Sequence, residues 1–87
     1  MKIILHKNFK KQYKRLTNSE KIRFKERRDL FLENPFDPIL NNHPLSGKKY
    51  YGYRSIDIKG DLRVIFWSLN SETALFVAVG THNKLYK

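Results

Sequence analysis

The chain has 87 residues, of which 40% are hydrophobic and 14% aromatic, enough for a single domain over residues 1–87 and too much for a disordered segment. Its 18 lysines and arginines against 8 acidic residues give a net charge of +10, so we expect a negatively charged partner, either a nucleic acid or an acidic protein. The lack of cysteine excludes disulfides and thiolate zinc sites, and the strand-length apolar runs argue against a membrane protein, so a cytoplasmic protein is expected.

The N-terminal residues predict a short strand followed by a short helix. Residues 2–6 contain adjacent β-branched side chains, which favours a strand. Phe9, Tyr13 and Leu16 recur at helical spacing among lysines and arginines, so they predict a basic helix with one apolar face. A cap for this helix is expected at residues 7–8.

A second helix is predicted from its start and stop signals. Thr17 and Glu20 have the spacing of a capping box, and Pro35 ends the helix within a turn-rich segment. The two helices are expected to form a hairpin over residues 8–34. The buried side of the second helix is expected to contain Ile22, Phe24, Leu30, Phe31 and Leu32.

Three further strands are expected at residues 50–58, 62–69 and 73–81. The polar breaks at residues 59–61 and 70–72 are short, which favours tight antiparallel hairpins. The order β-α-α-β-β-β predicts an α+β fold in which a helical hairpin packs on one face of a mainly antiparallel four-stranded sheet. The opposite face is expected to be free for function.

The end of the chain brings three kinds of functional side chain together. His82, Lys84 and Tyr86 offer an imidazole that can move a proton, an ammonium that can hold a phosphate and a phenol that can stack on a base. These are the tasks of a small ribonuclease. The alternative is a surface histidine in a loose tail, and from the residues alone the two interpretations stay open.

Other residues could complete such a site. His43 lies before a turn, where it could equally cap a backbone group, while Asp57, Asp61 and Arg63 flank a predicted hairpin. The Asp61 and Arg63 pair could be a simple surface ion pair or a base beside a phosphate clamp. Metal-independent RNA cleavage needs a base, an acid and a cation, and these residue types supply all of them.

A basic and aromatic segment follows His43. Lys48, Lys49 and Arg54 alternate with tyrosines, a pattern suited to single-stranded RNA, although a solvated strand with aromatic pairs is the alternative. The histidines at positions 6, 43 and 82 lack metal-ligand spacing, and no glycine-rich phosphate loop is present, so neither a metal nor a cofactor is expected.

Four ordered segments resemble a known group of proteins. They are residues 43–47 (His-Pro-Leu-Ser-Gly), 52–54 (Gly-Tyr-Arg), 61–66 (Asp-Leu-Arg-Val-Ile-Phe) and 80–86 (Gly-Thr-His-Asn-Lys-Leu-Tyr). In this order they resemble the RelE/ParE toxin superfamily, most closely its YafQ-like branch. The match covers residues 43–87, about half of the chain, and the predicted strand and helical hairpin agree with the family fold.

The resemblance implies a toxin of a type II toxin–antitoxin pair that cuts messenger RNA in the ribosomal A site without a metal. Its partners would be a cognate antitoxin, mRNA and the ribosome. By position, His82 would be the general acid, with Asp61 or His43 assisting in deprotonation. Arg63 would stabilise the phosphate, and Tyr86 would stack on the substrate base.

The sequence departs from the YafQ-like pattern at two positions. Asp57 stands where the pattern has a further histidine, which makes it a possible accessory residue, and Leu62 stands where the pattern has tryptophan. The alternatives are a ParE-like inhibitor of DNA gyrase and a non-catalytic RNA-binding module. The joint presence of five residues favours the nuclease branch; they are His43, Asp61, Arg63, His82 and Tyr86.

Overall fold

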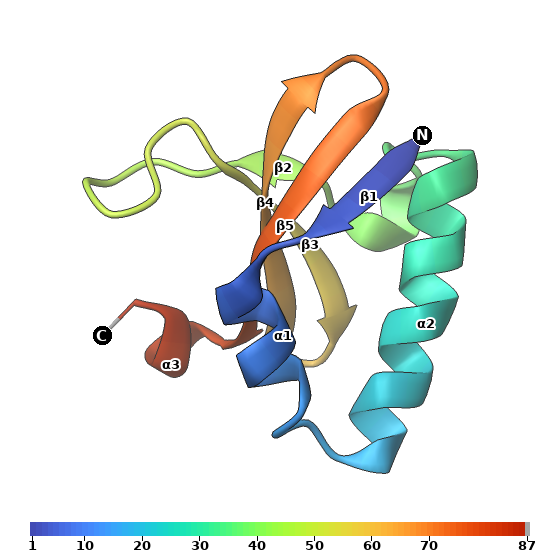
Figure 1. The fold of residues 1–87 in the computed structure, drawn as a ribbon, viewed down its shortest axis with the longest axis vertical. Helices are drawn as coiled ribbons and strands as arrows, with labels where there is room; N and C mark the ends of the chain where they lie inside the picture. The colour runs from blue at the N-terminus through green and yellow to red at the C-terminus, as the bar shows by residue number, and fades with distance from the viewer. Residues whose placement is uncertain (87) are drawn as a thin grey trace.

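The computed structural model describes residues 1–86. In chain order the elements are β1 (Lys2–Leu5), α1 (Lys7–Tyr13), α2 (Asn18–Glu33), the 3-10 helix η1 (Pro38–Leu40), β2 (His43–Pro44), β3 (Arg54–Lys59), β4 (Leu62–Asn70), β5 (Thr73–Thr81) and α3 (His82–Leu85). The strands form one sheet in the order β1-β5-β4-β3-β2, with α2 along one side (Figure 1). The predicted α+β class is confirmed.

The sheet is mainly antiparallel, as predicted. β3, β4 and β5 form a meander of hairpins, and β1 alone is parallel, pairing with β5. A fifth strand joins the expected four, because His43 and Pro44 pair with Ser55 and Arg54 at the edge of the sheet. A strand of two residues is too short to leave an alternating pattern in the sequence.

β3 begins later than predicted, at Arg54 rather than at residue 50. The chain turns instead of extending here, because Gly47 and Gly52 adopt φ angles of 101° and 88°, a region open to glycine. Residues 45–53 therefore form a projecting loop, which we call the aromatic loop because it contains three tyrosines.

The helices begin at side-chain caps. The capping box predicted at Thr17 is present, since Thr17 Oγ1 accepts from Glu20 N at 3.1 Å and Glu20 Oε1 accepts from Thr17 N at 2.8 Å. The cap predicted for α1 at residues 7–8 is wrong by one residue. His6 is the cap, and its ring Nδ1 accepts from Asn8 N at 3.0 Å.

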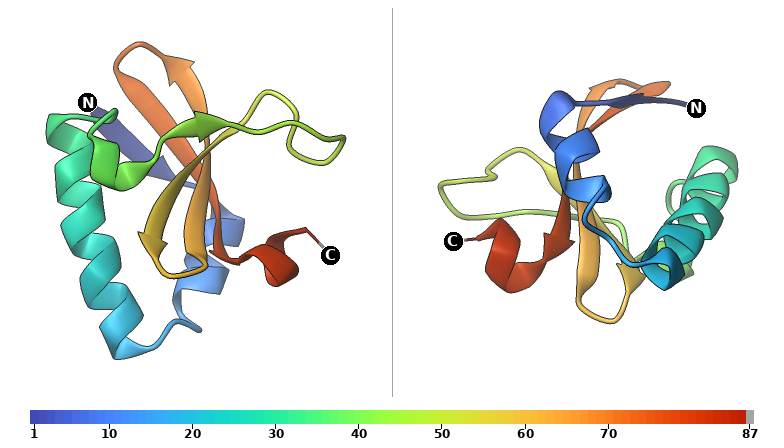
Figure 2. Two further views of the ribbon diagram at one scale, coloured as in Figure 1. Left: turned by 180° about the vertical axis from the view of Figure 1, so that it is seen from behind. Right: turned by 60° about the horizontal axis from the view of Figure 1, so that its bottom comes forward.

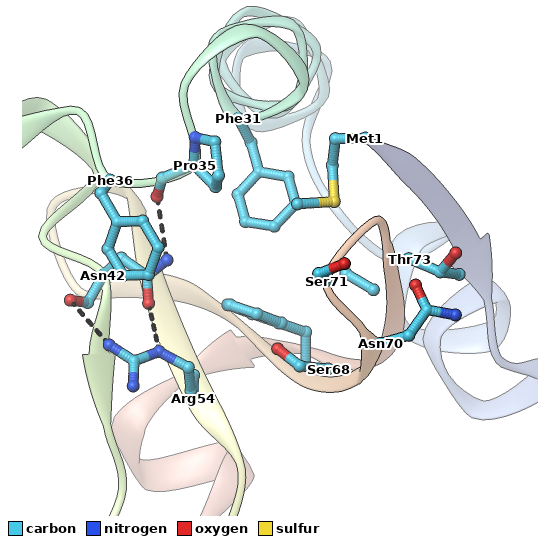
Figure 3. Close-up of a pocket in the computed structure, with 12 residues that line it drawn as sticks. Met1, Phe31, Pro35, Phe36, Asn42, Arg54, Ser68, Asn70, Ser71 and Thr73 are labelled. Carbon is cyan, nitrogen blue, oxygen red and sulfur yellow. Dashed lines mark hydrogen bonds between the residues drawn. The ribbon is translucent and has the colours of Figure 1, made fainter.

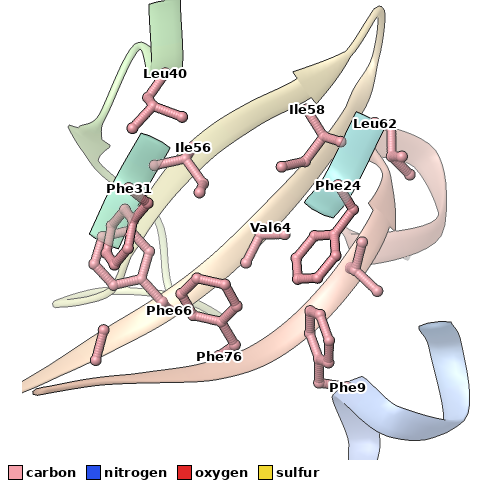
Figure 4. Packing of buried hydrophobic residues seen from close by; sticks show 12 residues of the cluster. Phe9, Phe24, Phe31, Leu40, Ile56, Ile58, Leu62, Val64, Phe66 and Phe76 are labelled. Atoms are coloured by element: carbon pink, nitrogen blue, oxygen red, sulfur yellow. The ribbon is translucent and has the colours of Figure 1, made fainter. Parts of the chain in front are cut away.

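Both main helices contribute to one apolar core on the same face of the sheet (Figure 4). The rings of Phe9 and Phe24 lie 5.5 Å apart, and the ring of Phe31 lies 5.5 Å from that of Phe76. The buried residues of this core are Phe9, Phe24, Phe31, Leu40, Ile56, Ile58, Leu62, Val64, Phe66, Ala74, Phe76 and Val79.

Two of the predicted core residues of α2 are exposed. Ile22 is 61% exposed and Leu32 is 36% exposed, whereas Phe24 and Phe31 are buried. At about 100° per residue, Ile22 lies roughly 200° around the helix from Phe24, so it faces away from the sheet. A two-layer fold buries one side of the helix, and the apolar count alone does not reveal which side.

The opposite face of the sheet is only partly free, which corrects the expectation of an open surface. Figure 2 shows α3 and the aromatic loop on the side of the sheet opposite α2. Leu85 of α3 is buried against Ile65 and Ala78, and the aromatic loop adds Tyr50 and Tyr53. Among residues 1–86, no helix is both long and apolar enough to cross a membrane.

Candidate functional site

α3 fixes the end of the chain against the sheet. Leu85 anchors it in the second apolar cluster, while His82 remains exposed. His82 and Tyr86 are four residues apart and therefore lie on one side of the helical turn, where their rings stack with centroids 4.5 Å apart at 28°. Residues 82–86 are thus a held element rather than a loose tail.

The Asp61 carboxylate connects the β3–β4 turn to the start of α3. Its Oδ1 accepts from Arg63 Nη2 at 2.8 Å, and its Oδ2 accepts from the backbone N of His82 at 3.1 Å. The side chains of Arg63 and Asp61 are 22% and 54% exposed, so solvent weakens the ion pair to at most about 1 kcal/mol. Its consequence is geometric, because it holds Arg63 beside the backbone of His82.

The strand register places further candidate residues on this face. Asp57 pairs with Arg63, and Arg63 pairs with Gly80, so the side chains of Asp57 and Arg63 project from the same side of the sheet. Asp57 Oδ2 accepts from Asn41 Nδ2 at 3.1 Å. Asp57 is therefore beside Arg63, and one of its oxygens already accepts a hydrogen bond from Asn41.

His43 lies on the same face but at the far edge of the sheet. Across the sheet it is aligned with Ser55 of β3, Ile65 of β4 and Ala78 of β5. Three strand spacings separate His43 from Ala78, so their backbones are roughly 14 Å apart. Its Nδ1 lies 2.7 Å from the carbonyl oxygen of Asn41. Because a carbonyl only accepts, Nδ1 carries the proton, and Nε2 of the neutral ring has a lone pair available.

The structure separates the predicted RNA-binding cations. Lys48 is exposed on the aromatic loop, and Lys49 Nζ donates to the carbonyl oxygen of Leu85 at 2.9 Å, which ties this loop to α3. Lys84 instead lines a hollow of about 400 Å³ beside Gln12 and Arg15. Lys49 thus connects the aromatic loop to the helix that carries His82, whereas Lys84 of that helix lines a different hollow.

Arg54 lies apart from these cations, on the helical face of the sheet. Its Nε donates to Asn42 Oδ1 at 2.7 Å, and its guanidinium lies 5.4 Å from the ring centroid of Phe36. It lines a separate hollow of about 430 Å³ near Phe31 and Met1 (Figure 3). The alternation of β3 explains this position, because Arg54 shares its face with the core residue Ile56 and not with Asp57.

A continuous run of rings extends from the His82 and Tyr86 stack, and we call it the aromatic strip. Centroid separations are 5.3 Å for Tyr86 to Tyr50, 5.9 Å for Tyr50 to Tyr53 and 4.9 Å for Tyr53 to Trp67. Burial, followed by the neighbouring phenols of Tyr86 and Tyr53, raises the pKa of Tyr50 above its ordinary value of 10.0. Tyr50 is therefore a neutral phenol, able to donate a hydrogen bond.

Sequence reasoning missed Trp67 and Ser55. Trp67 shares its strand face with Arg63 and Ile65, and the period of two in β4 could have revealed this. Ser55 Oγ is buried and has no hydrogen-bond partner within the described residues. No group of three or more potential metal-ligating side chains occurs in residues 1–86.

Comparison with known proteins places this geometry in context. Residues 1–87 match the family described as bacterial toxin of type II toxin–antitoxin system, YafQ. The crystal structure of YafQ from E. coli strain BL21(DE3) is similar with a TM-score of 0.80 and 24% identity, covering 98% of this chain and 97% of that chain. No protein of curated function matches the sequence.

Two structures of toxin–antitoxin complexes contain a similar chain. The E. coli DinJ–YafQ complex matches with a TM-score of 0.77 and 24% identity, covering 98% of this chain and 96% of that chain. The RelB–RelE antitoxin–toxin complex from Methanococcus jannaschii matches with a TM-score of 0.67 and 22% identity, covering 95% and 94%. At these identities the likeness shows a shared fold.

Proposed function

Because this chain belongs to the YafQ family of bacterial toxins of type II toxin–antitoxin systems, we propose that it is an endoribonuclease that cuts messenger RNA in the ribosomal A site, in the cytoplasm. In the proposed reaction the ribose 2′-oxygen attacks the adjacent phosphorus and the bond to the 5′-oxygen of the next nucleotide breaks. The products are a 2′,3′-cyclic phosphate, or the 3′-phosphate formed from it, and a free 5′-hydroxyl. No metal takes part.

The observation that supports this proposal most strongly is the group of His82, Tyr86, Asp61 and Arg63 at one end of the sheet. An exposed imidazole, a partly exposed guanidinium and an aromatic ring lie together on a protein of net charge +10. In the proposal His82 protonates the leaving 5′-oxygen, and Arg63 stabilises the charge that grows on the phosphate. One face of Tyr86 is covered by His82, so an approaching base meets the stack and not Tyr86 alone.

The proposal divides deprotonation and positioning between two residues. Both oxygens of Asp61 already accept hydrogen bonds, so we assign Asp61 to positioning Arg63 and α3. The base is then His43, whose Nε2 has an available lone pair. His43 on β2 lies three strands from β5, so in the proposal the scissile phosphate is held between the two histidines, within reach of Arg63 on β4.

The proposed inhibitor of this activity is a cognate antitoxin with an acidic segment. The net charge of +10 supports such a partner, since opposite charges speed association and favour a specific orientation. The E. coli DinJ–YafQ and M. jannaschii RelB–RelE structures are complexes of a toxin with its antitoxin. The same logic is proposed for this chain.

The test is His82→Ala in a cell-free translation reaction with a defined message. Loss of a general acid should slow cleavage by roughly 10²–10⁴-fold, whereas Asn83→Ala, at the next exposed position of α3, should cut normally. Cut sites are mapped with and without ribosomes, and circular dichroism checks the fold. Cleavage by His82→Ala at the wild-type rate would reject the catalytic assignment, and cutting without ribosomes would reject the A-site assignment.

A further inference from the structure

A third hollow adjoins the aromatic strip, on the face of the sheet that carries α3. It has a volume of about 440 Å³, within the range of roughly 300–1,000 Å³ typical of small-ligand sites. The β1–α1 junction forms one wall and the aromatic loop forms the other, although they are distant in the sequence. The lining residues are His6, Asn8, Lys49, Tyr50, Tyr53, Leu75, Val77 and Ala78.

We propose that this hollow binds the RNA nucleotide next to the one held at His82 and Tyr86, and that His6 donates a hydrogen bond to it. The inference rests on the proposed function, because it extends the path of the same RNA strand. It adds a recognition residue, His6, that takes no part in the bond-breaking steps.

The hollow is continuous with the candidate active site. The ring of Tyr50 contacts Tyr86 at 5.3 Å and also lines the hollow, so one side chain belongs to both places. Lys49 Nζ joins the hollow to α3 through the carbonyl oxygen of Leu85. An RNA strand that runs from the His82 and Tyr86 stack along the aromatic strip would therefore place its next nucleotide in this hollow.

The lining suits one nucleotide. Leu75, Val77 and Ala78 supply apolar surface for the face of a base, and the tyrosine rings supply walls for stacking. The phenol of Tyr50 is neutral, so it can donate a hydrogen bond to a base edge or a phosphate. The positive ammonium of Lys49 at the rim favours a phosphate over a neutral ligand.

The hydrogen bonds around His6 fix which ring atom donates. Nδ1 accepts from Asn8 N at 3.0 Å, so the proton of the neutral ring is on Nε2. Asn8 Nδ2 donates to the carbonyl oxygen of Val77 at 3.0 Å, which holds the start of α1 against the hollow. His6 is exposed and thus presents a positioned donor.

The substitution that isolates this donor is His6→Asn. Asparagine is a good helix N-cap, so its Oδ1 keeps the start of α1, while its shorter side chain leaves no donor at the position of the imidazole Nε2. Lys7→Asn is the matched control, because Lys7 is exposed, adjacent and absent from the lining. It removes a full positive charge nearby, and so it reports any general electrostatic loss.

The experiment measures the affinity of 2′-O-methyl RNA of one, two and three nucleotides, which cannot be cleaved, by NMR titration of the full chain. We expect His6→Asn to weaken binding of the two- and three-nucleotide RNAs by about tenfold, in line with loss of one charge-assisted hydrogen bond, and to leave the mononucleotide unchanged. Lys7→Asn should weaken all three equally and slightly. Thermal unfolding verifies that both variants keep the wild-type fold.

Two results would overturn the inference. One is equal affinity of wild type and His6→Asn for the longer RNAs, and the other is an equal loss for RNAs of every length. Failure of the proposed function looks different. If the wild-type protein cuts no message but His6→Asn still loses the length-dependent affinity, the hollow is an RNA subsite and the endoribonuclease proposal is rejected.

Discussion

Asp61 is the residue that determines the geometry of the candidate site. Its two oxygens bind groups from different elements, Arg63 of β4 and the backbone N of His82 in α3. The sequence spacing left open whether Asp61 and Arg63 form an ion pair or a base beside a phosphate clamp. The structure shows the ion pair. Because Asp61 also accepts a hydrogen bond from the backbone N of His82, the pair holds Arg63 next to α3.

Tyr50 makes a residue-scale prediction about pH. Its pKa is higher in the folded protein than the ordinary value of 10.0, so the folded state holds the phenol proton more tightly than the unfolded state does. The contribution of Tyr50 to the unfolding free energy is therefore complete below pH 10.0 and is lost as the pH rises through the pKa of the folded state. As the pH rises above 10.0, the unfolding free energy of wild type should therefore fall more steeply than that of Tyr50→Phe.

Urea unfolding at several pH values measures this difference, and lysine titration cancels because both proteins contain the same lysines. Tyr51→Phe, at a ring that is 79% exposed, corrects for the loss of one tyrosine. Parallel pH profiles for wild type and Tyr50→Phe would contradict the prediction.

At the scale of elements, α3 and the aromatic loop convert one face of the sheet into a site. α3 is only four residues long, too short to be stable by itself, and it is held by burial of Leu85 and by the bonds to Asp61 and Lys49. The aromatic loop is shaped by two glycines, and at Gly52 an added Cβ would lie 2.8 Å from the ring of Trp67. Neither element shows a periodic pattern in the sequence.

The capping box of α2 makes a prediction for an element. Thr17→Ala removes an acceptor for the backbone N of Glu20, which should cost about 1 kcal/mol of unfolding free energy and lower the Tm by roughly 4–8 °C. Differential scanning calorimetry measures the change. Asn18→Ala, at the exposed next position, should not lower the Tm, because alanine has the higher helix propensity. Equal Tm values for Thr17→Ala and wild type would show that the box contributes nothing.

At the scale of the whole molecule, exposed lysines lie on both sides of the sheet, such as Lys25 on α2 and Lys48 on the aromatic loop, whereas the candidate site occupies one side. Eighteen lysines and arginines attract a polyanion from any direction, so the net charge does not define a binding surface. The sheet does define a binding surface. Because α2 covers one face, the face that carries α3 and the aromatic loop is the one left for RNA.

This division predicts unequal effects of two lysines on RNA binding. Lys48→Ala, on the aromatic loop, should reduce the slope of log affinity against log salt by about 0.7–1 if it contacts one phosphate. Lys25→Ala, on the exposed side of α2, changes the net charge equally and should leave the slope unaltered. Fluorescence anisotropy with uncleavable 2′-O-methyl RNA measures both slopes. The same slope in both variants would remove Lys48 from the interface.

Features that depend on near neighbours along the chain could be predicted from the residues alone. Thr17 and Glu20 mark the start of α2, the polar breaks around Gly60 and Ser71 mark the hairpins, and the motifs of residues 43–87 led to the toxin family, which is confirmed over residues 1–87. These signals are local because capping, turn geometry and strand alternation act over a few residues.

Which side chains meet became visible in the fold. It placed Arg54 on the helical face, turned Ile22 to solvent, paired His43 with Ser55 and brought His6 opposite Lys49 across a hollow. These positions depend on strand register and on which side of the sheet each element packs, and both are set by cooperative burial of residues far apart in the chain. That is the physical reason why the motifs identified the family, while the arrangement of the candidate site required the fold.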